Sequence, residues 1–159
     1  LILPVRWNLA TAKPVLGTNP TEKLLTNGIR GSLKYSDFEW CSWADNDSVS
    51  FTIDLLKLEM LNTLILGCIT NNGMAIHKPA SVRVEVSDDN SKFREAVVQS
   101  FTSEEIFREG NFIENLSLKL GGTQARYVRV TAKGPGVCPA SHVRPGQTSR
   151  IFFDEVMLE

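Results

Sequence analysis

The stretch that decides the fold is ARYVRVTA, residues 125–132. Val128, Val130 and Ala132 alternate with Tyr127, Arg129 and Thr131, and Arg126 precedes this alternation. A period of two places the apolar side chains on one face of an extended strand and the others on the opposite face. The stretch therefore predicts a β-strand with one buried face, whose arginines pair with nearby acids.

A second strand-like stretch, IFFDEVML at residues 151–158, closes the sequence. It is apolar on both faces, as in a strand that is covered on both sides, yet it contains Asp154 and Glu155. Burying a carboxylate is costly unless a cation, a metal or backbone donors compensate its charge. We therefore expect both acids to have such partners.

The composition fits one globular domain. Of 159 residues, 42% are hydrophobic and 22% charged, which is an ordinary balance for a chain that buries a core. A net charge of −1 argues against non-specific nucleic-acid binding, which needs a clustered basic excess. No apolar run approaches the roughly 20 residues that span a bilayer. Because the sequence opens on Leu1, we expect an excised domain or mature product, with residues 1–7 as an interdomain tail and residues 8–159 as the domain.

Strand-like runs recur along the chain with turn residues between them. The expected strands are residues 49–55, 61–68, 81–87, 96–101, 116–120, 125–132 and 151–158. Strands at short intervals favour an all-β sandwich or barrel over alternating strands and helices. Helix is sparse: residues 21–25 and 103–107 each predict about one turn, the second with Ser103 as its N-cap.

The three cysteines cannot all pair within one chain, and none lie at a zinc-ligand or redox spacing. Cys68 follows an apolar run, so we expect it to be a buried thiol. A disulfide between Cys41 and Cys138 is the less favoured alternative to free thiols, because sequence alone cannot bring the two loops together.

Five segments, taken in order, resemble a known family. They are residues 8–15 (NLATAKPV), 25–31 (LTNGIRG), the group Trp40, Trp43 and Asp47, residues 49–55 ending in Ile-Asp-Leu, and residues 79–89 ending in Ser-Asp-Asp. Together they resemble the discoidin-like, or coagulation factor type C, domains, also called galactose-binding-like. The resemblance implies a jelly-roll β-sandwich of about eight main strands with a shallow site at one end. The nearest likeness is to C-terminal modules of bacterial family-twenty glycoside hydrolases, the β-hexosaminidases, which share residues 29–33, 35–37 and 137–142.

The first candidate sugar-binding segment is residues 35–47, which contains Tyr35, Asp37, Trp40 and Trp43. An indole or phenol face stacks on the apolar patch of a pyranose, and carboxylates accept hydrogen bonds from its hydroxyls. The competing interpretation is that the tryptophans plug one end of the sandwich. Of the two, we expect Trp40 to be the more exposed, because it adjoins a glutamate.

The second candidate segment is residues 134–150, an irregular loop stiffened by prolines that carries His142 and Arg144. Arginine can donate two parallel hydrogen bonds to vicinal hydroxyls, and neutral histidine can both donate and accept. His77, just before a strand, is the other histidine and completes the set of candidate ligand-binding residues. The alternative for each histidine is an exposed loop residue without a role.

The family resemblance also implies a structural calcium ion that joins the first glycine turn to the last strand. The matching positions are Asn27, Ser32 and Glu155, with backbone carbonyls near Leu24 and Arg30 completing an oxygen cage. The chain departs from the family pattern at Asn27, where a charged Asp is usual, and this weakens a site for a hard cation.

Catalytic groupings are weak in this sequence. Cys138 and His142 are four residues apart, but no third residue is identified to orient them. Asp37, Asp45 and Asp47 would have to lie ~5–10 Å apart across a cleft to act as a glycosidase pair. The sequence has no Gly-rich phosphate loop, His-Glu-x-x-His motif or nucleophile elbow. We therefore expect no enzymatic activity from this chain itself.

The function predicted from the sequence is carbohydrate binding. The resemblance implies a module of a secreted, periplasmic or cell-surface bacterial glycoside hydrolase that targets the attached catalytic domain to glycans containing galactose or N-acetylhexosamine. One alternative is a structural module that packs on the catalytic domain without binding sugar. Another is lipid-headgroup binding, which needs exposed apolar side chains beside basic ones and has only Phe38 and Trp40 as candidates. Neither a membrane nor a nucleic acid is expected as a partner.

Overall fold

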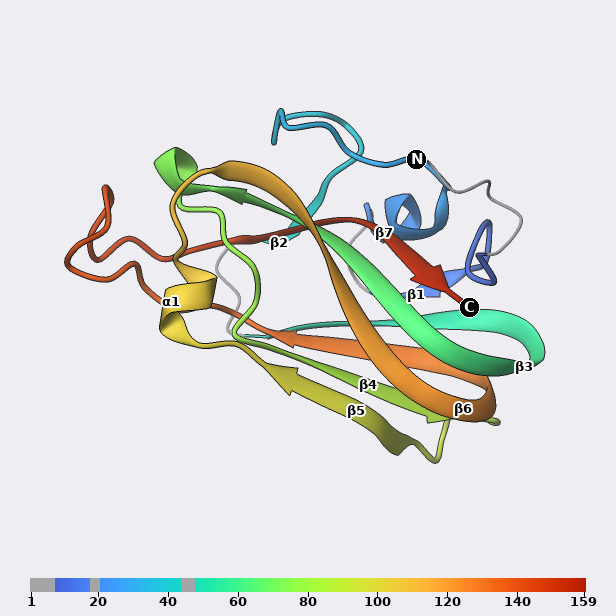
Figure 1. The fold of residues 1–159 in the computed structure, drawn as a ribbon. Coiled ribbons are helices and arrows are strands. Elements are labelled where there is room, and N and C mark those ends of the chain that lie inside the picture. The colour runs from blue at the N-terminus through green and yellow to red at the C-terminus, as the bar shows by residue number, and fades with distance from the viewer. Residues whose placement is uncertain (1–7, 18–20, 44–47) are drawn as a thin grey trace.

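The chain folds as an antiparallel β-sandwich (Figure 1), so the predicted all-β, discoidin-like fold class is confirmed. The computed structural model describes residues 8–17, 21–43 and 48–159, so the predicted interdomain tail at residues 1–7 lies outside the described residues. The strands are β1 (Val15–Leu16), β2 (Cys41–Trp43), β3 (Ser48–Asn71), β4 (Ser81–Ser87), β5 (Arg94–Ser100), β6 (Asn111–Lys133) and β7 (Ile151–Leu158). The helices are the 3-10 turns η2 (Glu22–Thr26) and η3 (Asn72–Met74) and the short α1 (Ser103–Ile106).

Two long, bent strands organise the sandwich. β3 and β6 pair antiparallel from Ser48↔Lys133 to Asn71↔Asn111, with register shifts at two places in the bend. The sequence prediction divided each of them into two strands, because the bend interrupts the apolar pattern around Leu56, which has a positive φ of 69°. The bend folds one hydrogen-bonded sheet into two layers that face each other, with β4 and β5 continuing one layer and β7 and β2 the other.

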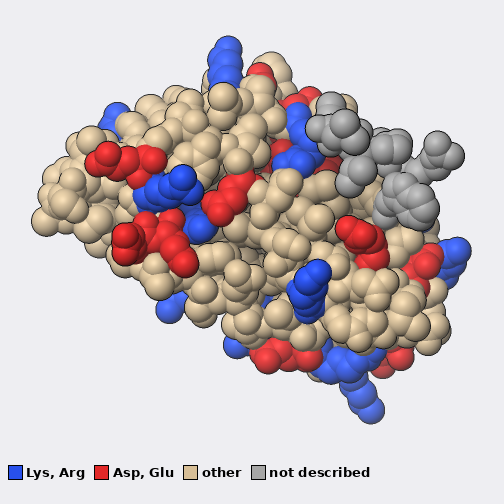
Figure 2. Space-filling view, in the orientation of Figure 1, with Lys and Arg blue, Asp and Glu red and all other residues tan. Residues whose placement is uncertain are grey.

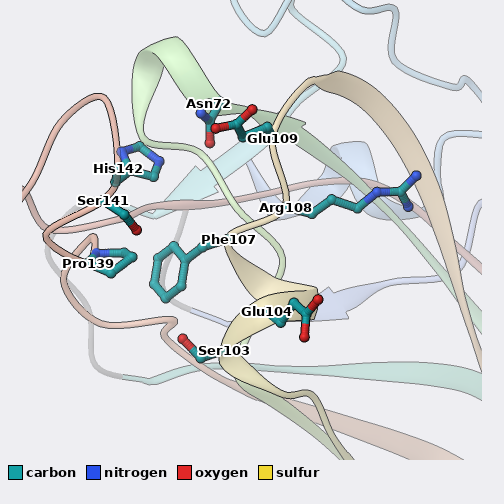
Figure 3. A pocket seen from close by; sticks show the side chains of 9 residues that line it. All are labelled: Asn72, Ser103, Glu104, Phe107, Arg108, Glu109, Pro139, Ser141 and His142. Atoms are coloured by element: carbon teal, nitrogen blue, oxygen red, sulfur yellow. The ribbon is translucent and has the colours of Figure 1, made fainter.

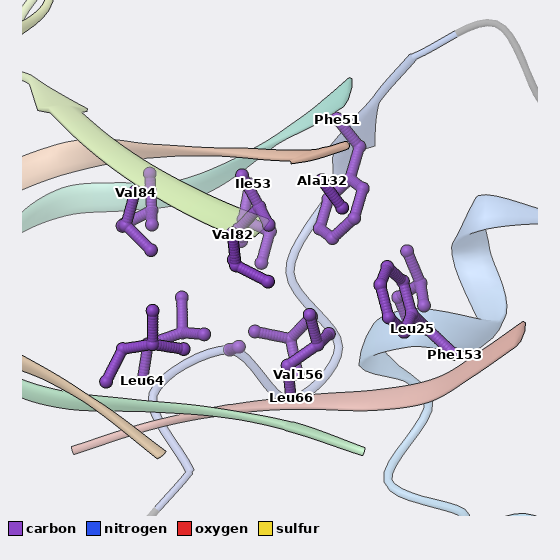
Figure 4. Close-up of a cluster of buried hydrophobic side chains, with 14 of the residues drawn as sticks. Leu25, Phe51, Ile53, Leu64, Leu66, Val82, Val84, Ala132, Phe153 and Val156 are labelled. Carbon is purple, nitrogen blue, oxygen red and sulfur yellow. The ribbon is translucent and has the colours of Figure 1, made fainter. Parts of the chain in front are cut away.

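The core lies between these two layers (Figure 4). Val82 and Val84 of β4 face Leu64 and Leu66 of β3, and all four side chains are buried. The alternation that predicted a buried face for residues 125–132 is confirmed, since every second side chain from Val128 onward enters this core.

β7 contains a bulge that controls where its acids point. Cys68 pairs with Phe153 and Leu66 with Val156, so one extra residue of β7 is accommodated between these pairs. Phe153 and Val156 can therefore both enter the core, which leaves the two acids between them on the outer face.

Both acids have the partners that the sequence analysis required. Asp154 is fully buried and accepts hydrogen bonds from Arg30 Nε at 2.8 Å and from the Gly31 amide at 2.9 Å. Glu155 accepts from the Gly28 amide at 3.1 and 3.2 Å. Burial raises the pKa of Glu155 to about 8, against the hydrogen bond from Gly28. These contacts fasten the segment after η2 to the outer face of β7.

The short helix α1 differs from the prediction in its cap. Thr102, rather than Ser103, is the N-cap: its hydroxyl accepts from the Glu105 amide at 3.2 Å, and the Glu105 carboxylate accepts from the Thr102 amide at 2.9 Å. Ser103 is already the first helical residue, so its side chain lies one position too late to cap. No helix in the described part of the chain has the length and apolarity needed to cross a membrane.

The cysteines are all free thiols, so the alternative of a Cys41–Cys138 disulfide is wrong. Cys41 belongs to the main core and contacts the Thr21 hydroxyl at 3.3 Å, whereas Cys138 lies near the two histidines of the loop end. The burial predicted for Cys68 is confirmed, and that burial raises the pKa of its thiol to about 12.

A pair of leucines in β3 tests the assignment of the core. Leu66→Ala removes a fully buried side chain and should lower the free energy of unfolding by about 2–5 kcal/mol. Leu58→Ala, in the same strand but half exposed, should cost much less. Urea denaturation of both variants measures the difference, and equal losses would contradict this placement of the core.

Candidate functional site

Irregular segments gather at one end of the sandwich (Figure 1). This loop end contains η3, α1, the segment before β4 and residues 134–150. Backbone hydrogen bonds join the segments: Arg150 N donates to Ala75 O at 3.0 Å, and His77 N donates to Arg150 O at 3.1 Å. The long loop is therefore held at its end through Arg150, and it starts directly after Lys133, which pairs with Ser81 in the sheet. Its middle projects from the sandwich.

A cavity of about 370 Å³ opens between α1 and this loop (Figure 3). Its lining residues are Asn72, Ser103, Glu104, Phe107, Arg108, Glu109, Pro139, Ser141 and His142. The volume lies within the range of small-ligand sites. Aromatic and pyrrolidine rings form one side of the cavity, and carboxylates and a guanidinium lie at its rim.

Two histidines and a phenylalanine pack together beside the cavity. His77 Nε2 lies 2.9 Å from His142 Nε2, and the Phe107 ring stands edge-on at 5.1 Å from the His77 ring. His142 Nδ1 accepts a hydrogen bond from the Arg144 amide at 2.9 Å. In the neutral pair, His142 therefore carries its proton on Nε2 and donates it to His77 Nε2, and His77 carries its own proton on Nδ1.

His77 is not the exposed loop residue that the sequence left open as an alternative, because its side chain is fully buried. Burial, and then the neighbouring His142, lower the pKa of His77 to about 4, so the ring is neutral at pH 7. The backbone of Ile106 acts in the opposite direction and raises the pKa of His77, although no hydrogen bond joins it to the His77 ring.

Arg144 holds the loop in place and does not line the cavity. Its Nε donates to the Gly73 carbonyl of η3, and its Nη1 donates to Gln147 Oε1 at 3.3 Å. Of the six predicted ligand-binding residues, only His142 lines the cavity.

The predicted exposure of Trp40 is wrong. Only 6% of its surface is accessible, and it packs with Ile69, Ile76 and Phe152 in a second hydrophobic cluster. Its Nε1 donates to the Ser32 carbonyl at 3.0 Å. The cause is tertiary: residues 28–40 lie over the outer face of β3 and β7, which the adjacent glutamate could not reveal.

Tyr35 and Asp37 belong to the same covering segment. The Tyr35 ring stands edge-on to Phe152 at 6.2 Å between centroids, and the Asp37 carboxylate accepts from the Ser32 hydroxyl. Neither lines the cavity, so the structure does not bring the two predicted segments together in one concavity. Asp45 and Asp47 lie outside the described residues.

Residues 10–143 match the F5/8 type C domain. The chain belongs to the F5/8 type C domain family. No match was found among curated proteins.

Solved structures share the fold of this F5/8 type C domain at low identity. CpGH89CBM32-6 of Clostridium perfringens has a TM-score of 0.57 at 16% identity, covering 96% of this chain and 98% of that one. A fucose binding module of Streptococcus pneumoniae has a TM-score of 0.54 at 19% identity, covering 96% of both chains. The C-terminal domain of a Bacteroides fragilis chitobiase has a TM-score of 0.52 at 19% identity, covering 86% of this chain and 78% of that one. The fold is thus that of family-32 carbohydrate-binding modules.

The arginines of β6 in this F5/8 type C domain pair with acids, as predicted. Arg126 donates to Asp54 at 2.8 and 3.0 Å, and Arg129 donates to Glu85 at 3.2 and 3.0 Å. The hydrogen bond from Arg126 lowers the pKa of Asp54. On the face shown in Figure 2, positive and negative side chains are likewise interspersed.

Several cavity residues escaped the sequence analysis, among them Phe107, Asn72 and Glu104. A signal for Phe107 was present, because it follows a capped helical turn between two expected strands. The signal for Asn72 was weaker, because asparagine is a common turn residue. In the structure its Oδ1 is buried without a hydrogen-bond partner among the described residues, so this oxygen is free to accept from a ligand.

Trp40→Ala tests the corrected position of this tryptophan. Removing a buried indole should lower the free energy of unfolding by about 3–5 kcal/mol. Phe38→Ala, which removes a side chain that is 92% exposed on the same segment, should stay within about 0.5 kcal/mol of the parent. Chemical denaturation followed by fluorescence measures both variants. An undiminished stability for Trp40→Ala would indicate that Trp40 is exposed.

Proposed function

We propose that this F5/8 type C domain is a non-catalytic carbohydrate-binding module and that the cavity at its loop end is the sugar site. The observation that carries the proposal is the cavity itself, in which Phe107 and the His142 ring lie beside polar groups. An aromatic face and convergent hydrogen-bonding groups are what a pyranose needs from a protein.

Each side of the cavity has a distinct role in this proposal. Phe107 offers an apolar surface for the C–H patch of a sugar ring, and Glu104 accepts hydrogen bonds from hydroxyls at the rim. The unpartnered Oδ1 of Asn72 accepts from a hydroxyl or from the N–H of an acetamido group. This arrangement supports galactose- or N-acetylhexosamine-containing glycans as ligands.

The carboxylates of the cavity support binding rather than hydrolysis. Glu104 and Glu109 are both exposed to solvent. A glycosidase needs a general acid whose pKa is raised by burial, in a site from which water is excluded. F5/8 type C domains are generally binding modules without catalysis, so we assign catalysis to an attached domain.

The named neighbours support attachment to a glycoside hydrolase. One of them is the C-terminal domain of a chitobiase, an arrangement in which a module of this fold accompanies a catalytic domain. We propose the same arrangement here, in a secreted, periplasmic or cell-surface bacterial enzyme that acts on hexosaminides. The role of the module is then to hold the catalytic domain near its glycan.

A second candidate function is packing against the catalytic domain without sugar binding. Ile29, Leu33 and Phe38 are exposed apolar side chains of the covering segment, and Phe38 is the most exposed at 92%. Exposed apolar residues on one segment are a feature of docking surfaces. The lipid alternative is weaker, because one of its two candidate side chains, Trp40, is buried.

We also propose a structural Ca²⁺ held by Asn27, Ser32 and Glu155. The buried Glu155 carboxylate accepts from the Gly28 amide at 3.1 and 3.2 Å, and burial raises its pKa to about 8. Asn27 directly precedes Gly28, and its carboxamide oxygen accepts a hydrogen bond from the Ile29 amide at 2.8 Å. The Ser32 hydroxyl donates a hydrogen bond to Asp37 and accepts one from the Lys34 amide at 3.2 Å, which leaves one oxygen lone pair available. The donors are all oxygens, as calcium prefers.

The sugar proposal predicts weak binding at one identified surface. Calorimetry with galactose, N-acetylglucosamine, N-acetylgalactosamine and fucose should give dissociation constants of about 10 μM to 1 mM for at least one sugar. Phe107→Ala should weaken that binding by up to about tenfold, because a stacking face is lost. Glu104→Gln, an exposed isosteric change, should weaken it without lowering the melting temperature.

Phe38→Ala is the control, since Phe38 lies outside the cavity. It should leave the sugar affinity unchanged. No response to any sugar at high millimolar concentration would favour the packing function instead. Sugar binding that is unchanged in both Phe107→Ala and Glu104→Gln would show that the sugar site lies elsewhere on the domain.

The calcium proposal predicts a change in melting temperature. With zinc absent, the chelator EGTA should lower it and added Ca²⁺ should restore it, because a ligand at 100 times its dissociation constant stabilises the native state by about 2.7 kcal/mol. Glu155→Gln should abolish the response to calcium. Superimposable melting curves of the parent protein with and without EGTA would refute the site.

A further inference from the structure

A group of nitrogen and sulfur ligands lies beside the cavity, and of its three members only His142 also lines the proposed sugar site. His77, Cys138 and His142 each offer a ligand atom, and all three atoms lie within 4.8 Å of one another. His77 and Cys138 are buried, and His142 is half-buried. The residues come from two segments of the loop end, since His77 is 61 positions before Cys138 and 65 before His142.

We propose that His77, Cys138 and His142 form a zinc-binding site that fastens the 134–150 loop to the segment before β4. Imidazole nitrogen and thiolate sulfur are the ligands that Zn²⁺ takes in proteins, and three protein ligands leave a fourth position for water. Calcium prefers oxygen, so the two proposed metal sites select different ions. The argument for zinc does not rest on the proposed sugar function, although His142 lines the cavity as well.

Zinc binding requires the three ligand atoms to move by about an ångström or less. Zinc–nitrogen bonds of about 2.0–2.1 Å and zinc–sulfur bonds of about 2.3 Å in a tetrahedron place the nitrogens about 3.3 Å apart and the sulfur about 3.6 Å from each. The two Nε2 atoms are now 2.9 Å apart, which is a hydrogen-bond length. They must separate by a few tenths of an ångström, and His142, in an exposed turn, can move that far. The Cys138 sulfur lies within 4.8 Å of the nitrogens and must approach by up to about 1.2 Å.

The backbone already fixes two of the three ligands. The His77 amide donates to Arg150 O at 3.1 Å. The Cys138 amide donates to Gln147 O at 2.8 Å, and the Cys138 carbonyl accepts from the Gly146 amide at 2.9 Å. A site whose ligands are held in place before the metal arrives loses less conformational entropy on binding.

Protons must be redistributed when the metal binds. The Cys138 thiol releases its proton to solvent, because the thiolate is the ligand. His77 already presents the lone pair of Nε2. On His142 the proton moves from Nε2 to Nδ1 by exchange with water, and the Arg144 amide then turns from Nδ1 toward solvent. Zinc therefore replaces the hydrogen between the two imidazoles, with one proton released overall.

The test uses the full chain without a histidine tag, kept reduced and stripped of metal. We expect one equivalent of Zn²⁺ to bind by calorimetry and to raise the melting temperature. Co²⁺ in its place should produce a thiolate-to-cobalt charge-transfer band, which reports directly on sulfur ligation. Cys138→Ala should abolish this band and lower the Zn²⁺ affinity by at least about 100-fold.

A matched variant separates ligation from loss of a thiol in general. Cys68→Ala removes another buried cysteine, in β3, and should keep both the cobalt band and the zinc affinity. His142→Ala, near the surface, should lose zinc while still unfolding cooperatively. Absence of the cobalt band in the parent protein, or equal zinc affinity in the parent and Cys138→Ala, would overturn the proposal.

Discussion

The antiparallel pairing of β3 with β6 is the interaction on which the rest of the structure depends. These two strands run through both layers, and their shared bend converts one sheet into a sandwich. Because the strands are continuous, the register on one side of the bend constrains the register on the other. At the end away from the bend, the same ladder places Asn71 opposite Asn111 and so brings η3 beside the chain that leaves α1. The loop end is a consequence of this one pairing.

The bulge in β7 has a comparable effect on the outer face. It turns Asp154 and Glu155 to the same side, where a fully buried carboxylate must have a charged partner. Arg30 provides it at 2.8 Å, and Gly67 permits it, since a Cβ there would overlap the Asp154 carboxylate. The ion pair fixes the start of the covering segment, and the Trp40 cluster fixes its end. One inserted residue in a strand thus determines which segment covers the outer face of β7.

One side of the cavity at the loop end is held rigidly, and the opposite side can adjust. α1 is held by a capping box and presents Phe107, whereas residues 134–150 are held at their ends and by Arg144. The histidine pair lies between these walls, with His142 facing the cavity and His77 buried behind it. Any ion bound by the pair would therefore act on the shape of the proposed sugar site. Binding residues on loops above a stable sheet are common, because loops can vary without disturbing the core.

Sequence alone determined the fold class, the buried face of residues 125–132 and the need for partners at Asp154 and Glu155. Each of these follows from local pattern or from the cost of burying a charge. Only the tertiary structure decided that Trp40 is buried, that Phe107 lines the cavity and that His77 meets His142 and Cys138. A local pattern reports which face a side chain occupies within its own segment. What covers that face, and which loops meet, depends on strand register and on one bulge, and a shift of one residue in either would change every such contact.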